Sequence, residues 1–276
     1  MDRVKAVEYN AQGLELEEEG KVTQAITAYK RAIKADPTFS YPYFNLGLIY
    51  KYKNKWKESF IYNQKAVEAD PKNEGALWNL GIAATALHKW NIAAQIWSKL
   101  GLKNPIKKAP LLYKDLGLIP VRLKNNGEVV WCDRLDPARA MINNIPTLDS
   151  KRSFEDIVLI DGAPEGYRVV EGQKIPVFNE LELFKASGNK TSIIKIIVSS
   201  EEKLRNLYNM LDKIKSIRYE DWTTSLRMLC HECSIDTPPE FTSNSSDSFI
   251  TKRTIALTSK NMESIKNIVK KISNHL

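Results

Sequence analysis

The stretch NLGLIY at residues 45–50 has counterparts 34 residues away on both sides, AQGLEL at 11–16 and NLGIAA at 79–84. The same period relates the glycines of these stretches and three prolines further along, namely Gly13, Gly47, Gly81, Pro37, Pro71 and Pro105. A fixed period of this length is typical of stacked helical hairpins, in which each repeat contacts only its neighbours. Arrays of this kind usually present an extended binding surface to other proteins.

Each repeat contains the apolar faces of two helices. In the first helix, the positions four before and three after the glycine define one face, occupied by Tyr9, Leu16, Tyr43, Tyr50, Leu77 and Ala84. In the second helix, a bulky residue such as Tyr29 or Trp97 can fill the space beneath the glycine, where the two backbones approach closely. The prolines end the second helix, because proline lacks an N–H and disfavours helical geometry in the preceding residue.

This pattern resembles the tetratricopeptide repeat over residues 6–107, in three units at 6–39, 40–73 and 74–107. The resemblance implies an N-terminal α-helical solenoid at 1–107. Two departures from the pattern are visible. Asn63 occupies the position of Tyr29 and Trp97 in the middle repeat, and Leu100-Gly101 predicts that the last helix ends early.

The resemblance also implies that the first helix of each repeat lines a concave surface. Offsets from the glycines then predict a partner-binding groove, here called the predicted groove, formed by Asn10, Leu14, Tyr41, Phe44, Asn45, Leu48, Tyr52, Trp78, Asn79 and Ile82. Its aromatic and amide side chains suit an extended or helical segment of a protein partner. Alternatively, part of this surface packs against the chain's own C-terminal region, because a short array leaves an end to be capped.

Some proteins with this repeat clamp the C-terminal carboxylate of a chaperone through lysine, arginine and asparagine side chains. The comparable positions here carry Asn10, Leu14, Asn45, Gly75 and Asn79. Only Asn45 has the expected type, and the cations of the clamp are missing. The sequence therefore argues against a chaperone tail as the ligand.

Length, composition and charge limit the number of domains, the cellular location and the classes of partner that we expect. The chain has 276 residues, of which 43% are hydrophobic, and this is enough for more than one packed domain. No apolar run reaches the roughly 18 to 20 residues that span a bilayer, and the N-terminus has no signal-peptide core, so we expect a cytoplasmic protein without a membrane partner. The net charge is +8, but the lysines and arginines are spread along the chain and interleaved with acidic residues, which argues against nucleic-acid binding. The oligomeric state is left open.

Residues 108–190 form a predicted β-rich region. Asn126-Gly127 marks a tight hairpin turn between strands near 121–123 and 128–132, and further strands are expected at 138–145, 156–160 and 174–184. They predict a compact antiparallel sheet or small barrel. We expect Asp161, Glu165 and Arg168 to lie in a tight turn with a local salt bridge, or else in a polar loop site.

Residues 191–276 form a predicted α/β region of two strand-helix units. The first has a strand at 191–199 and a helix that starts at Ser199, with Glu202 completing a capping box. The second has a strand at 250–257 followed by a helix. Buried stripes are predicted at Leu204, Leu207, Leu211, Ile265, Ile268 and Ile272. Two such units favour a small sandwich with both helices on one face of the sheet.

The second half of the chain is also similar to an uncharacterised region that follows repeats in some bacterial proteins. The residues that carry this similarity are the run 159–168 together with Trp131, Arg134, Pro137 and Arg139. No activity follows from it.

Cys230 and Cys233, with His231 between them, form the most chemically suggestive motif. Two thiolates at this spacing can supply half of a zinc site or form a redox pair, and a structural pair without either role is the third reading. The missing zinc ligands would come from Cys132, His231, Glu240 or His275, none of which has a recognisable ligand spacing. No other cofactor is expected.

No nucleophile-base set, glycine-rich phosphate loop or paired histidine motif is present in the sequence. The sequence therefore favours a protein-interaction adaptor or scaffold over an enzyme. The alternative is a metal-bearing regulatory or catalytic C-terminal domain that the repeats target to a partner.

Overall fold

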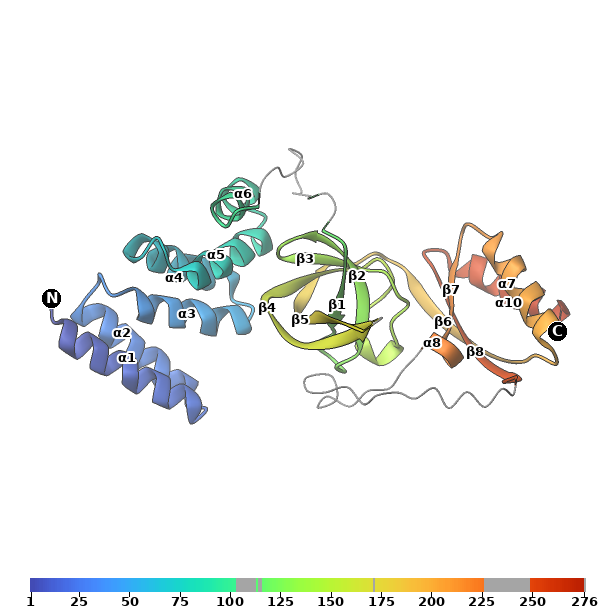
Figure 1. Ribbon diagram of the computed structural model, residues 1–276, viewed down its shortest axis with the longest axis horizontal. Helices are drawn as coiled ribbons and strands as arrows, with labels where there is room; N and C mark the ends of the chain where they lie inside the picture. The colour runs from blue at the N-terminus through green and yellow to red at the C-terminus, as the bar shows by residue number, and fades with distance from the viewer. Residues whose placement is uncertain (103–112, 114–115, 171, 226–248, 276) are drawn as a thin grey trace. The chain divides into compact units, whose positions relative to one another are not determined.

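A computed structural model describes residues 1–102, 113, 116–170, 172–225 and 249–275 (Figure 1). The chain divides into two compact units, residues 1–116 with 135–138 and residues 117–134 with 139–276. A helical repeat segment comes first, and strand-rich and mixed α/β regions follow it. The predicted fold class, an α-helical solenoid followed by α+β structure, is confirmed.

The repeat segment consists of six helices in three hairpins: α1 (Arg3–Glu18), α2 (Val22–Ala35), α3 (Ser40–Tyr52), α4 (Trp56–Ala69), α5 (Glu74–Ala86) and α6 (Trp90–Lys99). Helices α2 and α4 end just before Pro37 and Pro71. At the first of these turns, the Asp36 carboxylate accepts hydrogen bonds from the N–H and hydroxyl of Thr38, and these bonds lower the pKa of the carboxyl. Pro105 lies outside the described residues.

The two helices of each hairpin approach most closely at the repeat glycine. A Cβ placed there would lie only 2.6 Å from a side-chain carbon of the second helix in every repeat, in the pairs Gly13–Tyr29, Gly47–Asn63 and Gly81–Trp97. Real Cβ atoms do not tolerate this separation, and the opposing side chains are fully buried. The glycines thus recur every 34 residues because each hairpin can pack this closely only without a side chain at that position.

The middle repeat meets the same requirement with polar atoms. Asn63 Nδ2 donates to the carbonyl oxygen of Ser59 at 2.9 Å, and Ser59 Oγ donates to the carbonyl of Gly47 at 2.9 Å. The asparagine, which takes the place of an aromatic ring, thus bonds within α4, and the Ser59 hydroxyl makes the hydrogen bond that links α4 to α3. Helix α6 ends at Lys99, before Leu100-Gly101, as the sequence predicted.

The β-rich region is a closed barrel of five strands: β1 (Leu118–Arg122), β2 (Val129–Asp136), β3 (Arg139–Ile142), β4 (Ile157–Val170) and β5 (Gln173–Lys185). Consecutive strands are neighbours, and β1 closes the barrel by pairing in parallel with β5. The hairpin predicted around Asn126-Gly127 is confirmed, with Arg122 opposite Val129. Alternate residues fill the barrel, including Val121, Cys132 and Ile160.

The turn predicted at Asp161–Arg168 is wrong. These residues belong to β4, which pairs with β5 through register shifts between Ile160 and Pro164 and between Pro164 and Tyr167. The irregular pairing accommodates two glycines, Gly162 and Gly166, and a proline without ending the strand, because a bulge absorbs backbone that cannot join a regular ladder. Composition alone suggested a turn, whereas the partner strand maintains the extended backbone.

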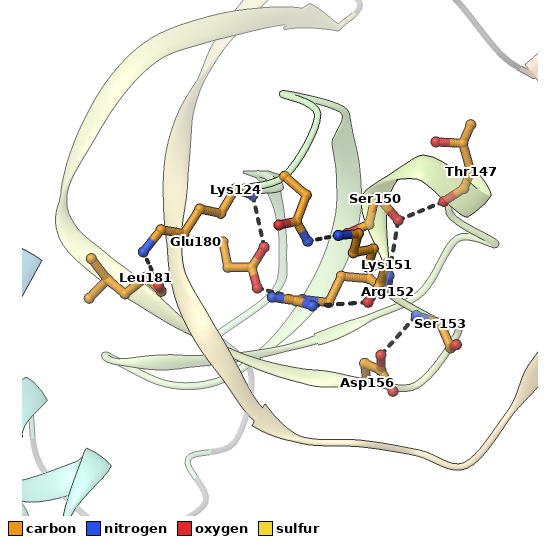
Figure 2. A network of polar contacts seen from close by, with 10 residues as sticks. Lys124, Thr147, Ser150, Lys151, Arg152, Ser153, Asp156, Glu180 and Leu181 are labelled. Carbon is orange, nitrogen blue, oxygen red and sulfur yellow. Dashed lines mark hydrogen bonds and ion pairs between the residues drawn. The ribbon is translucent and has the colours of Figure 1, made fainter. Parts of the chain in front are cut away.

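A buried carboxylate joins β5 to the loop that precedes β4. Glu180 is fully buried and accepts from Arg152 Nε at 2.6 Å and from the Lys124 N–H at 2.9 Å (Figure 2). The 3-10 turn at Leu148–Ser150 lies beside this pair, and Asn125 Nδ2 donates to the Ser150 carbonyl at 2.6 Å. A carboxylate withdrawn from water requires such partners, so this network is structural.

The α/β region contains β6 (Lys190–Ile197), α7 (Glu201–Asp212), β7 (Arg218–Asp221), α8 (Trp222–Ser225), β8 (Lys252–Ser259) and α10 (Met262–His275). The sheet order is β6-β8-β7. Helices α7 and α10 pack on one face through the predicted leucine and isoleucine stripes, which are buried together with Ile255 and Leu257. Ser200, one residue later than expected, caps α7 by accepting from Lys203 N–H, and β7 was not predicted.

The barrel and this sheet are joined through β7 and α8. The Glu220 carboxylate accepts from the Ile145 N–H at 2.9 Å, and Trp222 Nε1 donates to the Ile145 carbonyl at 3.2 Å. Ile145, Trp222 and Ala256 form a small apolar cluster beside Phe154. One residue of the barrel is therefore held at both its backbone groups by side chains of the α/β region.

We expect Gly81→Ala to lower the free energy of unfolding of the repeat helices by about 1–3 kcal/mol, because the added methyl group overlaps the Trp97 ring. Alanine is otherwise the better helix former, so the sign of the change is diagnostic. Urea unfolding followed by circular dichroism at 222 nm measures it. Gly75→Ala on the same helix is the control, since its Cβ would meet only the edge of the Phe44 ring at 3.0 Å. Equal stability of the two variants would contradict the steric account.

Candidate functional site

The residues of the predicted groove lie on α1, α3 and α5 but differ widely in exposure. Tyr41 and Tyr52 are each 57% exposed, and Leu14 is 45% exposed. Phe44, Asn45, Leu48 and Trp78 are half-buried. Asn10 and Asn79 are buried, and Ile82 is fully buried, so its side chain is not available to a partner in this structure. The accessible part of the predicted groove thus lies on α1 and α3, together with Trp78.

The structure brings two of the predicted amides together. Asn45 Nδ2 donates to Asn10 Oδ1 at 3.1 Å, which joins the first and second repeats. An amide has two N–H donors and a carbonyl that can accept twice, so this one bond leaves hydrogen-bonding capacity on both side chains. That capacity suits a peptide backbone lying across the two helices.

Two predicted aromatic residues also have structural roles. The edge of the Phe44 ring, at Cε2, lies 3.0 Å from the position where a Cβ on Gly75 of the next repeat would stand. The Trp78 ring is tilted against the buried Trp97 ring, with centroids 5.3 Å apart. Trp78 therefore supports the third hairpin in addition to contributing to the surface, and its truncation would affect both.

A buried cation next to the predicted groove was not anticipated. Lys51 is 2% exposed, and its ammonium lies 4.5 Å from the centroid of the Tyr52 ring. It stands four residues after Gly47, where the other repeats carry Glu17 and Thr85. A polar residue at this position of every repeat was the signal available in the sequence.

Glu17 and Thr85 show what this position does in the other repeats. Glu17 accepts a hydrogen bond from the hydroxyl of Tyr29, and burial, followed by this bond, raises the pKa of the tyrosine. Thr85 Oγ1 donates to the carbonyl oxygen of Gly81 at 2.9 Å. Both side chains form polar contacts at the close approach of their hairpin, so the position is structural in the outer repeats.

The cysteine motif cannot be placed. Cys230, His231 and Cys233 lie outside the described residues, as does Glu240. Cys132, a candidate fourth ligand, is fully buried in the barrel core, where burial raises the pKa of its thiol. Within the described ranges no group of three metal-ligating side chains occurs. Zinc binding by the motif stays a prediction.

Comparison with known families identifies the helical hairpins. A family model described as "TPR repeat" matches residues 13–54, and one described as "Tetratricopeptide repeat" matches residues 41–73. These hairpins are tetratricopeptide repeats. The third hairpin, α5 and α6, has the same contact between glycine and ring.

The solved structures that are similar to the chain include two domains of one protein. One is the second TPR of Spaghetti (RPAP3) bound to HSP90 peptide SRMEEVD, at 29% identity and a TM-score of 0.34 over 36% of this chain and 93% of that one. The other is the first TPR of the same protein bound to the same peptide, at 24% identity and a TM-score of 0.34, over 36% of this chain and 79% of that one. Among curated proteins, none matches the sequence. The similarity of the second half to bacterial repeat proteins stays a prediction.

Truncating Asn45 to alanine removes its bond to Asn10, and we expect this to lower the free energy of unfolding by about 0.5–1.5 kcal/mol. Asn91→Ala is the matched control, because Asn91 is exposed on α6. Thermal unfolding followed at 222 nm compares the two variants. If both melt like the wild-type protein, the asparagine pair does not couple the first two repeats.

Proposed function

We propose that this protein is an interaction adaptor whose repeat helices bind a segment of a partner protein in the predicted groove. The observation that carries the proposal is the combination of exposed Leu14, Tyr41 and Tyr52 with the Asn10–Asn45 pair on the same two helices. Apolar and aromatic side chains supply contact area, while the amides satisfy backbone groups that a bound segment withdraws from water.

The proposal also covers the cellular location of the protein and the kind of partner that occupies the groove. Among the described residues, no helix has the length and apolar character needed to cross a bilayer. The cytoplasmic location favoured by the sequence is part of the proposal, and so is the view that the groove takes a separate protein. Occupation by the chain's own C-terminal region is the competing outcome of the experiment below.

The double variant Leu14→Ala/Tyr41→Ala tests the groove with little damage to the fold, since both side chains are well exposed and Trp78 is left in place. We expect it to weaken partner capture by about 30-fold or more, the loss typical of central contact residues. Capture from lysate with mass spectrometry identifies the partner, and titration of its purified segment gives the affinity.

Ile61→Ala is the control for this experiment, because Ile61 is apolar and, at 50%, exposed to a similar degree as Leu14 and Tyr41, but lies on α4. Circular dichroism checks that each variant stays folded. Capture that is unchanged in the double variant, or equally reduced in the control, would show that the partner binds elsewhere. If the isolated partner segment binds only after the C-terminal region is displaced, the groove is occupied in cis.

The peptide SRMEEVD gives a sharp test of ligand class. We expect binding no tighter than about 100 μM, because none of the positions comparable to the clamp carries a lysine or arginine, and each charge-assisted bond typically contributes about 1.5–3 kcal/mol. Fluorescence anisotropy with a labelled peptide measures the affinity. A dissociation constant near 10 μM or below, lost on amidation of the peptide's C-terminus, would show that this array is a carboxylate clamp after all.

A further inference from the structure

A cavity of about 650 Å³ lies in the second unit, where the barrel meets the α/β sheet. Its walls come from the end of β3, the segment before β4, the turn between α7 and β7, and the turn between β8 and α10. The residues used below are Glu155, Lys215, Arg218, Thr258, Ser259 and Lys260. The proposed adaptor function uses none of them.

The charges lining this cavity are predominantly positive. Lys215, Arg218 and Lys260 face a single carboxylate, Glu155. Lys260 Nζ stands 4.0 Å from Glu155 Oε2, and both side chains are well exposed, so this pair neutralises little of the positive charge. The Arg218 guanidinium lies 5.9 Å from the centroid of the Phe154 ring. An anion entering the cavity would therefore meet excess positive charge.

A buried hydroxyl without a partner lies in the same wall. Thr258 is 1% exposed, and its Oγ1 has no hydrogen-bond partner within the part of the chain that the structure describes. Thr258 lies on β8 directly opposite Arg218 of β7 and opposite Thr191 of β6, whose Oγ1 is likewise buried and unpaired. Buried polar groups are rarely left unpaired, so an unpaired hydroxyl on a residue that lines a cavity points to an acceptor supplied by a ligand.

The backbone around Thr258 adds to this arrangement. Helix α10, with 14 residues, begins at the cavity, where the N-terminal end of a helix carries partial positive charge. Ser259 Oγ donates to the Ser216 carbonyl at 2.8 Å and accepts from the Asn261 N–H at 3.1 Å. The first of these bonds joins the turn that carries Lys215 to the turn that carries Lys260, so the backbone of the site is held in place before any ligand arrives.

We propose that this cavity binds a small phosphate-bearing ligand, with Lys215, Arg218 and Lys260 supplying charge and Thr258 donating its hydroxyl hydrogen. A phosphate group has several acceptor oxygens in a tetrahedral arrangement and can take bonds from a guanidinium, an ammonium and a hydroxyl at once. The site is separate from the repeat helices. The adaptor would thus carry a small-molecule site in its second unit.

Pyrophosphate titrated into the full-length protein at constant ionic strength tests the proposal by calorimetry. We expect saturable binding at one site, weakened at least about tenfold by Thr258→Val and by Lys215→Gln. Thr258→Ser retains the hydroxyl and should bind like the wild-type protein. The valine variant should not melt at a lower temperature, because it loses an unpaired hydroxyl, and this separates a binding role from a structural one.

Lys213→Gln is the matched control, since Lys213 is exposed two residues from Lys215 and does not line the cavity. Its affinity should stay within about twofold of wild type. The proposal fails if pyrophosphate does not saturate the protein below about 10 mM, if Lys213→Gln weakens binding as much as Lys215→Gln, or if Thr258→Val binds normally. Citrate that competes as well as pyrophosphate would show a site that recognises charge and would overturn the assignment to phosphate.

Discussion

The close approach of two helix backbones at each repeat glycine determines the arrangement of the N-terminal unit. A methyl group at Gly13, Gly47 or Gly81 would overlap the side chain facing it, so the chain must keep glycine at these places and a matching residue 16 positions later. When the closed hairpins stack, Asn10 and Asn45 of neighbouring repeats form a hydrogen bond, and the exposed tyrosines Tyr41 and Tyr52 lie on the same helix as Asn45. The proposed binding surface is thus a by-product of how tightly the helices pack.

Much of the fold was predictable because its signals are local. The glycine and proline period fixed the hairpins, Asn126-Gly127 fixed the first turn of the barrel, and leucine and isoleucine spacing fixed the helices on the sheet. Where the sequence misled, a distant partner decided the outcome. Pairing with β5 keeps Asp161–Arg168 extended despite two glycines and a proline, and β7 exists because β8, more than 30 residues later, pairs with it.

The candidate sites were less predictable for the same reason. Offsets from a glycine identify the face of a helix but not how deeply each residue is covered, so Ile82 appeared among the groove residues although it is fully buried. Lys51 was overlooked because a lysine in a helix is normally solvated. The cavity in the second unit could not be derived at all, since its walls come from segments separated by more than 100 residues.

The hydrogen-bonded contact between Asn63 and Ser59 beneath Gly47 affects how stability is distributed along the repeat array. In a linear array the stability of each hairpin is roughly its own folding energy plus the coupling to its neighbours. The middle hairpin closes on a small amide, with one oxygen unpaired in the described structure, where the outer hairpins close on large rings. We therefore expect the stability of the middle hairpin to depend on its coupling to both flanking repeats. A change that destabilises either outer hairpin should then also destabilise α3, the helix that carries most of the proposed binding surface.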